Sequence, residues 1–556
     1  MPVIDLDRER QTVDLDAALE AVGPFRRGQQ VQLALVGLSW LLAAVQTLTA
    51  VVWACLDPLR HLADEAACTK PDDTACSEAL ASGTLCSLPR EAWAWRAPGA
   101  SLVSEWDMVC GRRWLLYFQS SLFFLAVLAG CVLCQLSAER FGRRRLLYAG
   151  ATLCGLCSVL ASTAPSLWLY LVFRATSGAA MGGMGLAAYA LAADVAGPSW
   201  RGFLGLVMNH FFSVGACVGT LLAWWLPASW RLLTFLAGLC CLAYIPTWSL
   251  VVESPQWLLL HGKKGEATAA LAALSLANGT RPPEHPLSDP TALLGNTQRE
   301  LKDVLASSRL RQRLALLGGA WFAAAAGYFG LMLLADGMSR GPSGSDDSVY
   351  VTLLSAFAYE VPGIAAAGLA VERAGRKATG ITAFLQAGVC LVVAAVSGAT
   401  ARRALMVAAR FGLAAAYASL YLHTSELFPA VVREQGLAAA NLLGRAGAAI
   451  SPLWAFLQFR LRSAFVPLLV LGCLGVAGGA LTAMLPETLG EKVPETIQEM
   501  NMLLNLRRKR SWRVALAGIL RPGAGGGAGQ GGLQSQRSAS LQGGEAYAAV
   551  LPARSA

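Results

Sequence analysis

Long apolar runs recur along this chain of 556 residues, and each is about 20 residues long. A helix of that length matches the roughly 30 Å hydrocarbon core of a bilayer, because an α-helix rises about 1.5 Å per residue. Only 14% of the residues are charged, whereas soluble domains are about a quarter charged. The chain is therefore predicted to be an all-α membrane protein that crosses the bilayer many times.

Twelve apolar spans are predicted, in two groups of six with polar segments around them. The spans lie near 30–54, 114–137, 146–164, 167–191, 203–225 and 231–251, and near 314–335, 349–371, 378–397, 404–424, 436–458 and 464–485. The predicted regions are an amino-terminal segment (1–29), a first half (30–251) with a polar cysteine loop (56–112), a central loop (252–313), a second half (314–485) and a tail (486–556). The tail becomes rich in Gly and Ser, so we predict disorder from about residue 520.

Basic residues in the short connections set the orientation. They gather before the first span, in "RFGRRR" (140–145), in "ERAGRK" (372–377) and in "RRKR" (507–510). Such residues mark the cytoplasmic side. Both termini and the central loop are therefore predicted to be cytoplasmic, and the cysteine loop extracellular. The sequon that begins at Asn278 falls on the cytoplasmic side, so we do not expect it to carry a glycan.

The extracellular loop carries an even set of cysteines. In an oxidising compartment such a set predicts disulfides, here two of them. Four cysteines allow three pairings, and the sequence does not choose among them. Their spacing fits no zinc motif, so no metal is expected. The four are Cys68, Cys76, Cys86 and Cys110.

The two halves repeat each other. The stretch "ERFGRRR" from Glu139 returns as "ERAGRK" from Glu372. Further on, Tyr189, Asp194 and Arg201 keep the spacing of Tyr421, Glu426 and Arg433. A repeat of this kind indicates two six-helix halves with a substrate site between them, near the middle of the membrane.

The charges of the repeat fall at the cytoplasmic ends of the helices. The acid and base of each short connection are predicted to lie near the acid and base that follow spans four and ten. Such charges can form a gate that latches the helix ends while the inner side is closed; alternatively, they only set topology. The residues concerned are Glu139, Arg143, Asp194, Arg201, Glu372, Arg376, Glu426 and Arg433.

Five motifs together resemble solute carrier family 22, the organic cation and anion transporters of the major facilitator superfamily. They are "SEWDMVC" (104–110), "ERFGRRR", "ESPQWLLLHGK" (253–263), "SELFPAVVREQG" (425–436) and "LPETLGEKVPETIQE" (485–499). The resemblance covers roughly 25–505. It implies a twelve-helix major facilitator fold that moves small organic ions across the plasma membrane by alternating access. Gln256 stands where the family has Arg, which is typical of a divergent member.

Few ionisable residues lie inside the spans, and such residues usually face the bundle interior or a water-filled cavity. They are Arg174, Glu360, Arg410 and Arg445. We expect Arg174 and Arg410 to have a structural role, with substrate contact as the alternative, whereas Glu360 either pairs with an arginine or binds a cation or proton. Arg445 lies about 15 Å into its helix, near the midplane. The resemblance implies that arginine here marks anion carriers, and a guanidinium binds carboxylates well. The alternative is a permanent Arg445–Glu360 pair.

Aromatic residues at positions that match the family's pattern are expected to line the cavity, or else to pack within the bundle. They are Trp321, Tyr328 and Phe329 in span seven, Tyr417 and Tyr421 in span ten, and Trp225 in span five. The resemblance also implies a lysine in span eight of anion carriers, and Ile364 stands there. One positive charge fewer makes classical dicarboxylate exchange a poor fit.

The chain is thus predicted to be a monomeric plasma-membrane carrier of small organic anions. The alternatives are a carrier of organic cations or zwitterions centred on Glu360, and a receptor or scaffold with a transporter fold that moves nothing. No hydrolase, zinc-protease or phosphate-loop motif occurs. We therefore expect no enzymatic activity, no cofactor and no ATP, and the chain has no basic, aromatic-interleaved patch for nucleic acid.

Overall fold

The computed structural model describes residues 13–55, 66–69, 74–82, 85–95, 99, 101–226, 229–282, 285–288, 301–334, 347–429, 432–491, 494 and 496–502. Met1–Val493 forms one compact unit. The second unit is Pro494–Ala556, in which residues 497–502 are helical. The tail predicted to be disordered from about 520 lies outside the described residues.

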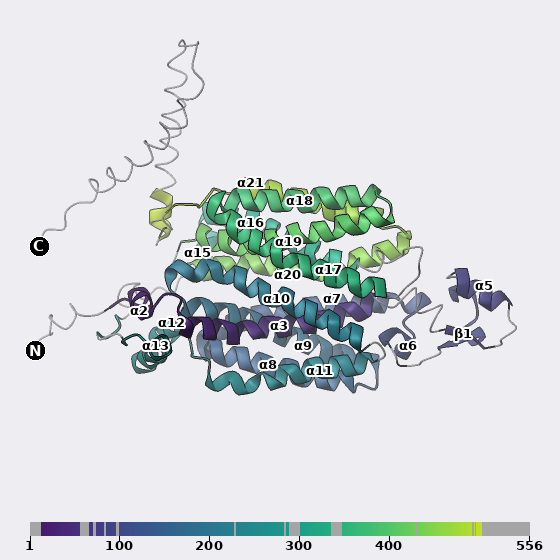
Figure 1. Ribbon diagram of the computed structural model, residues 1–556, viewed down its shortest axis with the longest axis horizontal. Coiled ribbons are helices and arrows are strands. Elements are labelled where there is room, and N and C mark those ends of the chain that lie inside the picture. The colour runs from purple at the N-terminus through teal and green to yellow at the C-terminus, as the bar shows by residue number, and fades with distance from the viewer. Residues whose placement is uncertain are drawn as a thin grey trace, which may run out of the picture. The chain divides into compact units, whose positions relative to one another are not determined.

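Twelve long helices fall on the twelve predicted spans. The first half contains α3 (Arg27–Cys55), α7 (Trp114–Phe141), α8 (Arg143–Ser162), α9 (Leu167–Val195), α10 (Arg201–Trp225) and α11 (Trp230–Ala243), which continues as the 3-10 turn η5 (Ile245–Ser249). The second half contains α16 (Ser308–Leu333), α17 (Asp347–Arg373), α18 (Arg376–Val396), α19 (Ala399–Leu427), α20 (Arg433–Leu461) and α21 (Phe465–Ala483). The two sets lie side by side (Figure 1).

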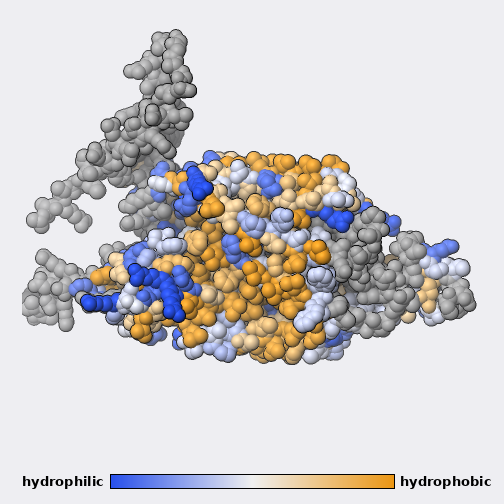
Figure 2. Space-filling model, viewed as in Figure 1, coloured by the Kyte–Doolittle hydropathy of each residue, from blue (hydrophilic) through white to orange (hydrophobic). Residues whose placement is uncertain are grey.

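Eleven of the described helices are long and apolar enough to cross a membrane. The twelfth, α20, has 29 residues and includes Arg445. Exposed leucine and valine side chains such as Leu136 and Val396 lie on the outer surface of the bundle. Hydrophobic residues cover the middle of the helices in Figure 2, as expected of a surface that faces lipid.

Close glycine contacts repeat between the halves. A Cβ added to Gly155 of α8 would lie 2.9 Å from the carbonyl oxygen of Gly238 in α11. In the second half, a Cβ on Gly388 of α18 would lie 2.9 Å from the carbonyl oxygen of Gly472 in α21. Small residues allow membrane helices to pack backbone to backbone. The matching pairs support the internal repeat independently of the charged motifs.

The cysteine loop contains small elements joined by two disulfides. Strand β1 (Ala66–Cys68) pairs antiparallel with β2 (Trp93–Trp95), and the helices α5 (Thr74–Ser82) and α6 (Leu102–Trp106) flank them. The two predicted disulfides are confirmed, and the pairing left open by the sequence is Cys68–Cys76 and Cys86–Cys110. We call the end of the helices that carries this loop the loop end.

The loop is fixed to the first half. Glu105 of α6 accepts a hydrogen bond of 2.9 Å from the indole Nε1 of Trp230 and forms an ion pair with Arg231. Arg231 also donates to the carbonyl oxygens of Ser162 and Ala164, at 2.6 and 2.9 Å. The "SEWDMVC" motif thus ties the loop to the ends of α8 and α11.

The segments predicted as the amino-terminal segment and the central loop contain short helices. These are α2 (Leu15–Val22), α12 (Pro255–Leu260) and α13 (Lys264–Asn278), and α15 (Leu301–Ala306) precedes α16. Residues of α2, α12 and α13 share one hydrophobic cluster. The described part of the central loop therefore contributes helices to a hydrophobic cluster.

Candidate functional site

A cavity with an empty volume of about 440 Å³ lies between the two halves. This volume includes space that is open to the surroundings of the cavity. Helices α3 and α10 line it from the first half, and α16, α17, α19 and α20 from the second. The lining residues are Trp40, Asn209, Phe212, Ser213, Tyr328, Phe329, Glu360, Ile364, Ala414, Tyr417, Tyr421 and Arg445.

Glu360 is the one acidic residue among the lining residues, and both oxygens of its carboxylate are engaged. Oε1 lies 2.5 Å from Nε of Arg410. Oε2 accepts hydrogen bonds from the hydroxyls of Ser213 (2.6 Å) and Tyr328 (3.0 Å). Glu360 and Arg410 are only 1% and 2% exposed. A buried ion pair with further hydrogen bonds neutralises this carboxylate.

Arg410 is held from several directions. Its Nη1 donates to the carbonyl oxygen of Tyr328 at 2.5 Å. The guanidinium carbon lies 3.7 Å from the ring centroid of Tyr328 and 4.9 Å from that of Phe357. Arg410, which we expected to be structural, is therefore the residue that pairs with Glu360. The alternative pair, Arg445 with Glu360, does not form among the described residues.

Arg174 of the first half is buried without a carboxylate partner among the described residues. Its Nη1 donates to Oε1 of Gln46 at 3.1 Å, and its Nη2 donates to Oγ1 of Thr49 at 2.9 Å. The guanidinium carbon lies 4.5 Å from the ring centroid of Phe123. These contacts join α3, α7 and α9, as a structural role requires.

Arg445 lines the cavity and forms no ion pair with a residue that the structure describes. The groups that interact electrostatically with its guanidinium are the thiol of Cys131 and the hydroxyls of Tyr417 and Tyr421. Its Nε has no hydrogen-bond partner. A guanidinium that lacks a counter-charge inside a membrane bundle is costly unless water or a ligand complements it. The net positive charge of the cavity therefore belongs to Arg445.

Tyr417 and Tyr421 form an aromatic wall on one face of α19. Trp321 of α16 packs edge-on against both rings, with centroid distances of 5.2 and 4.7 Å. Trp321 is fully buried, and its Nε1 donates to Oγ1 of Thr424 at 3.0 Å. It is absent from the cavity lining and supports the two tyrosines from behind.

The remaining predicted aromatic residues divide into two groups. Tyr328 and Phe329 line the cavity, and the Phe329 ring lies 4.9 Å from that of Phe124 in the first half. Trp225 does not reach the cavity, because it is 83% exposed at the last residue of α10. Helix α10 instead contributes Phe212, more than three turns earlier in the helix.

The sequence prediction also missed lining residues of the first half. It concentrated on ionisable residues and on the aromatic pattern of the second half. The tryptophan near the middle of the first apolar span was the available signal for Trp40. The missed residues are Trp40, Asn209, Phe212 and Ser213.

Side chains of the two halves meet on both sides of the cavity. At the loop end, Trp224 of α10 stacks on Tyr350 of α17, with ring centroids 6.4 Å apart. At the opposite end, the ring centroid of Tyr189 in α9 lies 5.2 Å from that of Tyr421 in α19. A small apolar cluster also joins α10 to the second half: Leu206, Ile364, Ala414 and Ala418.

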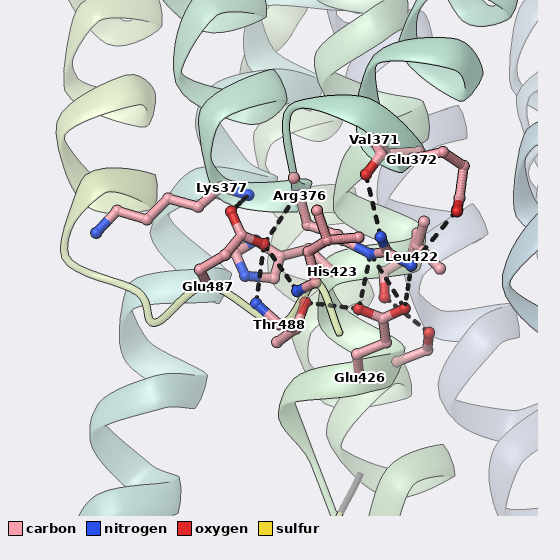
Figure 3. A network of polar contacts seen from close by, with 12 residues as sticks. Val371, Glu372, Arg376, Lys377, Leu422, His423, Glu426, Glu487 and Thr488 are labelled. Carbon is pink, nitrogen blue, oxygen red and sulfur yellow. Dashed lines mark hydrogen bonds and ion pairs between the residues drawn. The ribbon is translucent and has the colours of Figure 1, made fainter. Parts of the chain in front are cut away.

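The repeated charges meet in equivalent ways in the two halves. In the first half, Nε of Arg143 lies 3.6 Å from the carboxylate of Asp194. In the second, Nε of Arg376 lies 3.0 Å from Glu426, and its Nη2 lies 3.5 Å from Glu372 (Figure 3). The base of each short connection therefore contacts the acid at the end of α9 or α19.

The other repeated charges are placed differently. Arg201 pairs with Asp16 of α2 at 2.6 Å, a partner from outside the repeat. Glu139 is exposed, and its carbonyl oxygen accepts a hydrogen bond of 2.9 Å from Nε1 of Trp257. Arg433 is the first residue of α20, as Arg201 is of α10. The predicted gate charges thus share one end of the bundle, and Arg201 and Glu139 have partners outside the repeat.

Two glutamates from the family motifs cap equivalent helices. Each accepts hydrogen bonds from the first two backbone N–H groups of a helix, where such groups lack partners within the helix and favour negative charge. Glu253 accepts from Arg143 and Arg144 of α8 at 3.1 and 3.0 Å. Glu487 accepts from Arg376 and Lys377 of α18 at 2.9 and 3.1 Å (Figure 3).

The surroundings of Glu487 lower the pKa of its carboxyl group. Burial raises the pKa of Glu487, but backbone N–H groups of Leu489, Thr488, Arg376 and Lys377 outweigh this, so the pKa lies below its usual value. Hydrogen bonds donated to a carboxylate favour its charged form. The ionised carboxylate is therefore part of the folded structure at this end of α18.

Comparisons with known proteins agree with this architecture. The family model of the sugar (and other) transporters matches residues 100–500. The organic cation/carnitine transporter 4 of Arabidopsis thaliana is 30% identical over 499 residues, which cover 86% of this chain and 89% of that protein. Solute carrier family 22 member 6 of Oryctolagus cuniculus is 28% identical over 413 residues, covering 72% and 73%.

Solved structures give the same fold. The xylose transporter XylE from E. coli, in a partially occluded inward-open conformation, aligns with a TM-score of 0.59 and 16% sequence identity. The alignment covers 84% of this chain and 99% of that one. The predicted major facilitator fold, with twelve helices in two halves, is confirmed.

Proposed function

Because this chain belongs to the sugar (and other) transporter family, with relatives in solute carrier family 22, it is a membrane transporter of small organic molecules, and we propose that it carries organic anions by alternating access. Its relatives are transporters rather than enzymes. The observation that carries the anion proposal is the difference between the two charged residues of the cavity: Glu360 forms an ion pair, and Arg445 forms none with a described residue.

The charge balance favours an anion. The Glu360–Arg410 pair is neutral as a unit, so an incoming ligand meets the single positive charge of Arg445. At about 4 Å and an effective dielectric constant near 20, two unit charges interact by about 4 kcal/mol. A bound anion would be attracted to Arg445 by about this energy, whereas a bound cation would be repelled by it.

The lining also favours a particular shape of ligand. Rings of Trp40, Phe212, Tyr417 and Tyr421 offer flat apolar surfaces, while Ile364 stands where the resemblance implies a lysine. The Ile364 side chain packs in an apolar cluster and offers no second positive charge. We therefore propose a monoanion with a flat apolar body, and expect dicarboxylates to be poor substrates.

The proposed mechanism uses the contacts that flank the cavity. Opening toward the loop end would separate Trp224 from Tyr350, whereas opening toward the opposite end would separate Tyr189 from Tyr421. We assign the opposite end to the cytoplasm and the loop end to the outside, following the basic connections and the disulfides. The proposed location is the plasma membrane, with the chain acting as a monomer.

A cation or zwitterion carrier is the second candidate, because the carboxylate of Glu360 also lines the cavity. The relative from Arabidopsis thaliana is described as an organic cation/carnitine transporter. For a cation to use Glu360, it would have to displace the guanidinium of Arg410, which is 2.5 Å away and buried. That cost is the reason the anion proposal is preferred.

Uptake into proteoliposomes tests the proposal. The purified chain should take up benzoate in preference to benzylamine, a cation with a similar ring. Arg445→Ala should abolish benzoate uptake, and Arg460→Ala, an exposed arginine of the same helix, should leave it unchanged. Normal benzoate uptake by a well-folded Arg445→Ala variant would refute the role of Arg445. Failure of a broad panel of ions in the unmodified chain would favour a receptor.

A further inference from the structure

The amino-terminal segment 13–26 is folded onto the end of the first half that is opposite the cysteine loop. The N–H of Val13 donates to the carbonyl oxygen of Pro286 at 3.1 Å, and the N–H of Ser288 donates to that of Val13 at 2.9 Å. Helix α2 lies beside α12 and α13 (Figure 1). Its apolar side chains Leu19 and Val22 are fully buried in the cluster that these helices share.

The end of this segment is tied to α13 and α3. The side-chain amide of Asn278 donates to the carbonyl oxygen of Val22 at 3.0 Å, while its Oδ1 accepts from the N–H of Gly28 at 2.7 Å. The hydroxyl of Thr280 donates to the same Val22 oxygen at 2.9 Å. The apparent sequon residues thus act in docking the amino-terminal segment.

The same segment contacts the turn between α9 and α10. The carbonyl oxygen of Pro24 accepts a hydrogen bond of 2.9 Å from the N–H of Gly197. The ring of Phe25 stacks on Trp200, with centroids 4.8 Å apart and an interplanar angle of 17°. This turn allows little room, because a Cβ added to Gly197 would lie 2.7 Å from Cβ of Pro24.

An ion pair completes the contact. Oδ1 and Oδ2 of Asp16 lie 2.6 and 3.4 Å from the guanidinium nitrogens of Arg201, whose Nε also donates to the carbonyl oxygen of Ala193 at 3.3 Å. Arg201 is one of the charges that the internal repeat assigns to the gate. Its partner is an acid of the amino-terminal segment rather than one of the repeated acids.

The other side of the first turn of α10 packs against the second half. A Cβ added to Gly202 would lie 2.3 Å from Cδ1 of Leu422, and one added to Gly205 would lie 2.9 Å from Cβ of Tyr421. One turn further on, Leu206 packs with Ile364. The first turn of α10 therefore lies between the amino-terminal segment and the contact that closes the cavity at this end.

We propose that α12, α13 and the α9–α10 turn form a docking surface for an acidic amphipathic helix. Helix α2 of the same chain occupies this surface. Its docking holds α10 in the position that closes the inner end of the cavity. The surface offers Arg201 and an apolar stripe, and α2 presents Asp16 and Leu19 to them. The inference rests on the proposed alternating-access function, because closure has a role only in a carrier.

A cross-link across the closed contact tests the proposal. Leu206→Cys together with Ile364→Cys places one thiol on each side, and a short bifunctional thiol reagent reports how often the two are in contact, with mass spectrometry to identify the product. Asp16→Asn should lower the cross-linking rate by up to about fivefold, the range of a partly exposed ion pair. Asp14→Asn is the matched control, since Asp14 is exposed and makes no side-chain cap bond.

A second perturbation leaves every charge in place. Gly197→Ala should lower the cross-linking rate as well, because its methyl group would displace Pro24. A chain without residues 1–26 should cross-link most slowly, and a peptide of residues 12–27 added in trans should restore the rate, whereas a scrambled peptide should not. Size-exclusion profiles of the purified variants check that they are folded.

Equal cross-linking rates in the unmodified, Asp16→Asn, Gly197→Ala and truncated chains would overturn the proposal. The measurement needs no substrate, so it separates this inference from the proposed function. If the Arg445→Ala variant loses anion uptake but cross-links at the normal rate, the docking proposal still stands. Conversely, a variant of α2 that cross-links slowly supports docking even if the unmodified chain prefers another ion.

Discussion

The buried pair of Glu360 and Arg410 allows a quantitative prediction. Glu360→Gln removes the negative charge but keeps an oxygen that can accept from Ser213 and Tyr328. The loss is therefore confined to the ion pair, and Arg410, which is 2% exposed, is left as an uncompensated buried charge. Breaking a buried pair in this way costs about 3–5 kcal/mol.

The double variant Glu360→Gln, Arg410→Met separates the pair from the individual residues. Replacing both charges of a buried pair is often close to neutral. We expect the double variant to lie within about 2 kcal/mol of the unmodified chain, so it should be at least about 1 kcal/mol more stable than Glu360→Gln alone. The free energy of unfolding is measured by titrating the purified chain with a denaturing detergent.

The same variant separates the anion and cation proposals. In Glu360→Gln the cavity keeps the charge of Arg445 and gains that of Arg410, so the molecules that remain folded should still take up benzoate. A cation carrier centred on Glu360 would lose its activity instead. The reasoning is refuted if Glu360→Gln unfolds as the unmodified chain does, or if the double variant is no more stable than the single one.

Three further predictions concern other parts of the molecule. The pKa of Glu487 is lowered in the folded chain, so Glu487→Gln should destabilise the chain at pH 7, and the difference should vanish as the pH falls through the folded-state pKa, which pH-dependent thermal unfolding checks. The disulfide between Cys86 and Cys110 closes a loop with a sequence separation of 24 residues. Its removal should lower the stability of the folded loop by about 3 kcal/mol, and limited proteolysis should then cleave residues 66–112 sooner. Tyr417→Ala should raise the KM for benzoate about tenfold through lost stacking, whereas Trp225→Ala, on the exposed end of α10, should not change it.

The positions of the helices followed from the sequence because one physical demand decides them. A span must be apolar and about 20 residues long to cross the membrane, and the boundaries that flank Arg143 or Arg376 are further marked by a preceding glycine. Gly142 and Gly375 adopt positive φ angles of 86° and 94°, where glycine is at no disadvantage. Predicted and observed helices therefore differ mainly at their ends.

The partner of Glu360 could not be read from the sequence. Arg410 and Arg445 are both arginines inside spans of the second half, and either is able to neutralise a carboxylate. Which one does so depends on the rotation and depth of α19 and α20, and these depend on packing rather than on periodicity. The same holds for Trp225, whose place near the end of α10 decides that it faces outward.

The amino-terminal segment shows a different limit. Its sequence is acidic and amphipathic, which describes its composition and not its partner. The contact between Asp16 and Arg201 joins residues 185 positions apart. Only the folded arrangement of α2, α13 and the α9–α10 turn brings these two residues together, and no local sequence pattern predicts their contact.

Reversal of the charge at residue 445 tests the central claim most directly. Competitive uptake of benzoate and benzylamine by the unmodified chain should favour benzoate at least tenfold, and Arg445→Glu should invert the preference, because the cavity would then carry a net negative charge. Arg460→Glu, the same change on the exposed part of α20, should leave the preference as it is. An unchanged preference for benzoate in Arg445→Glu would contradict the account.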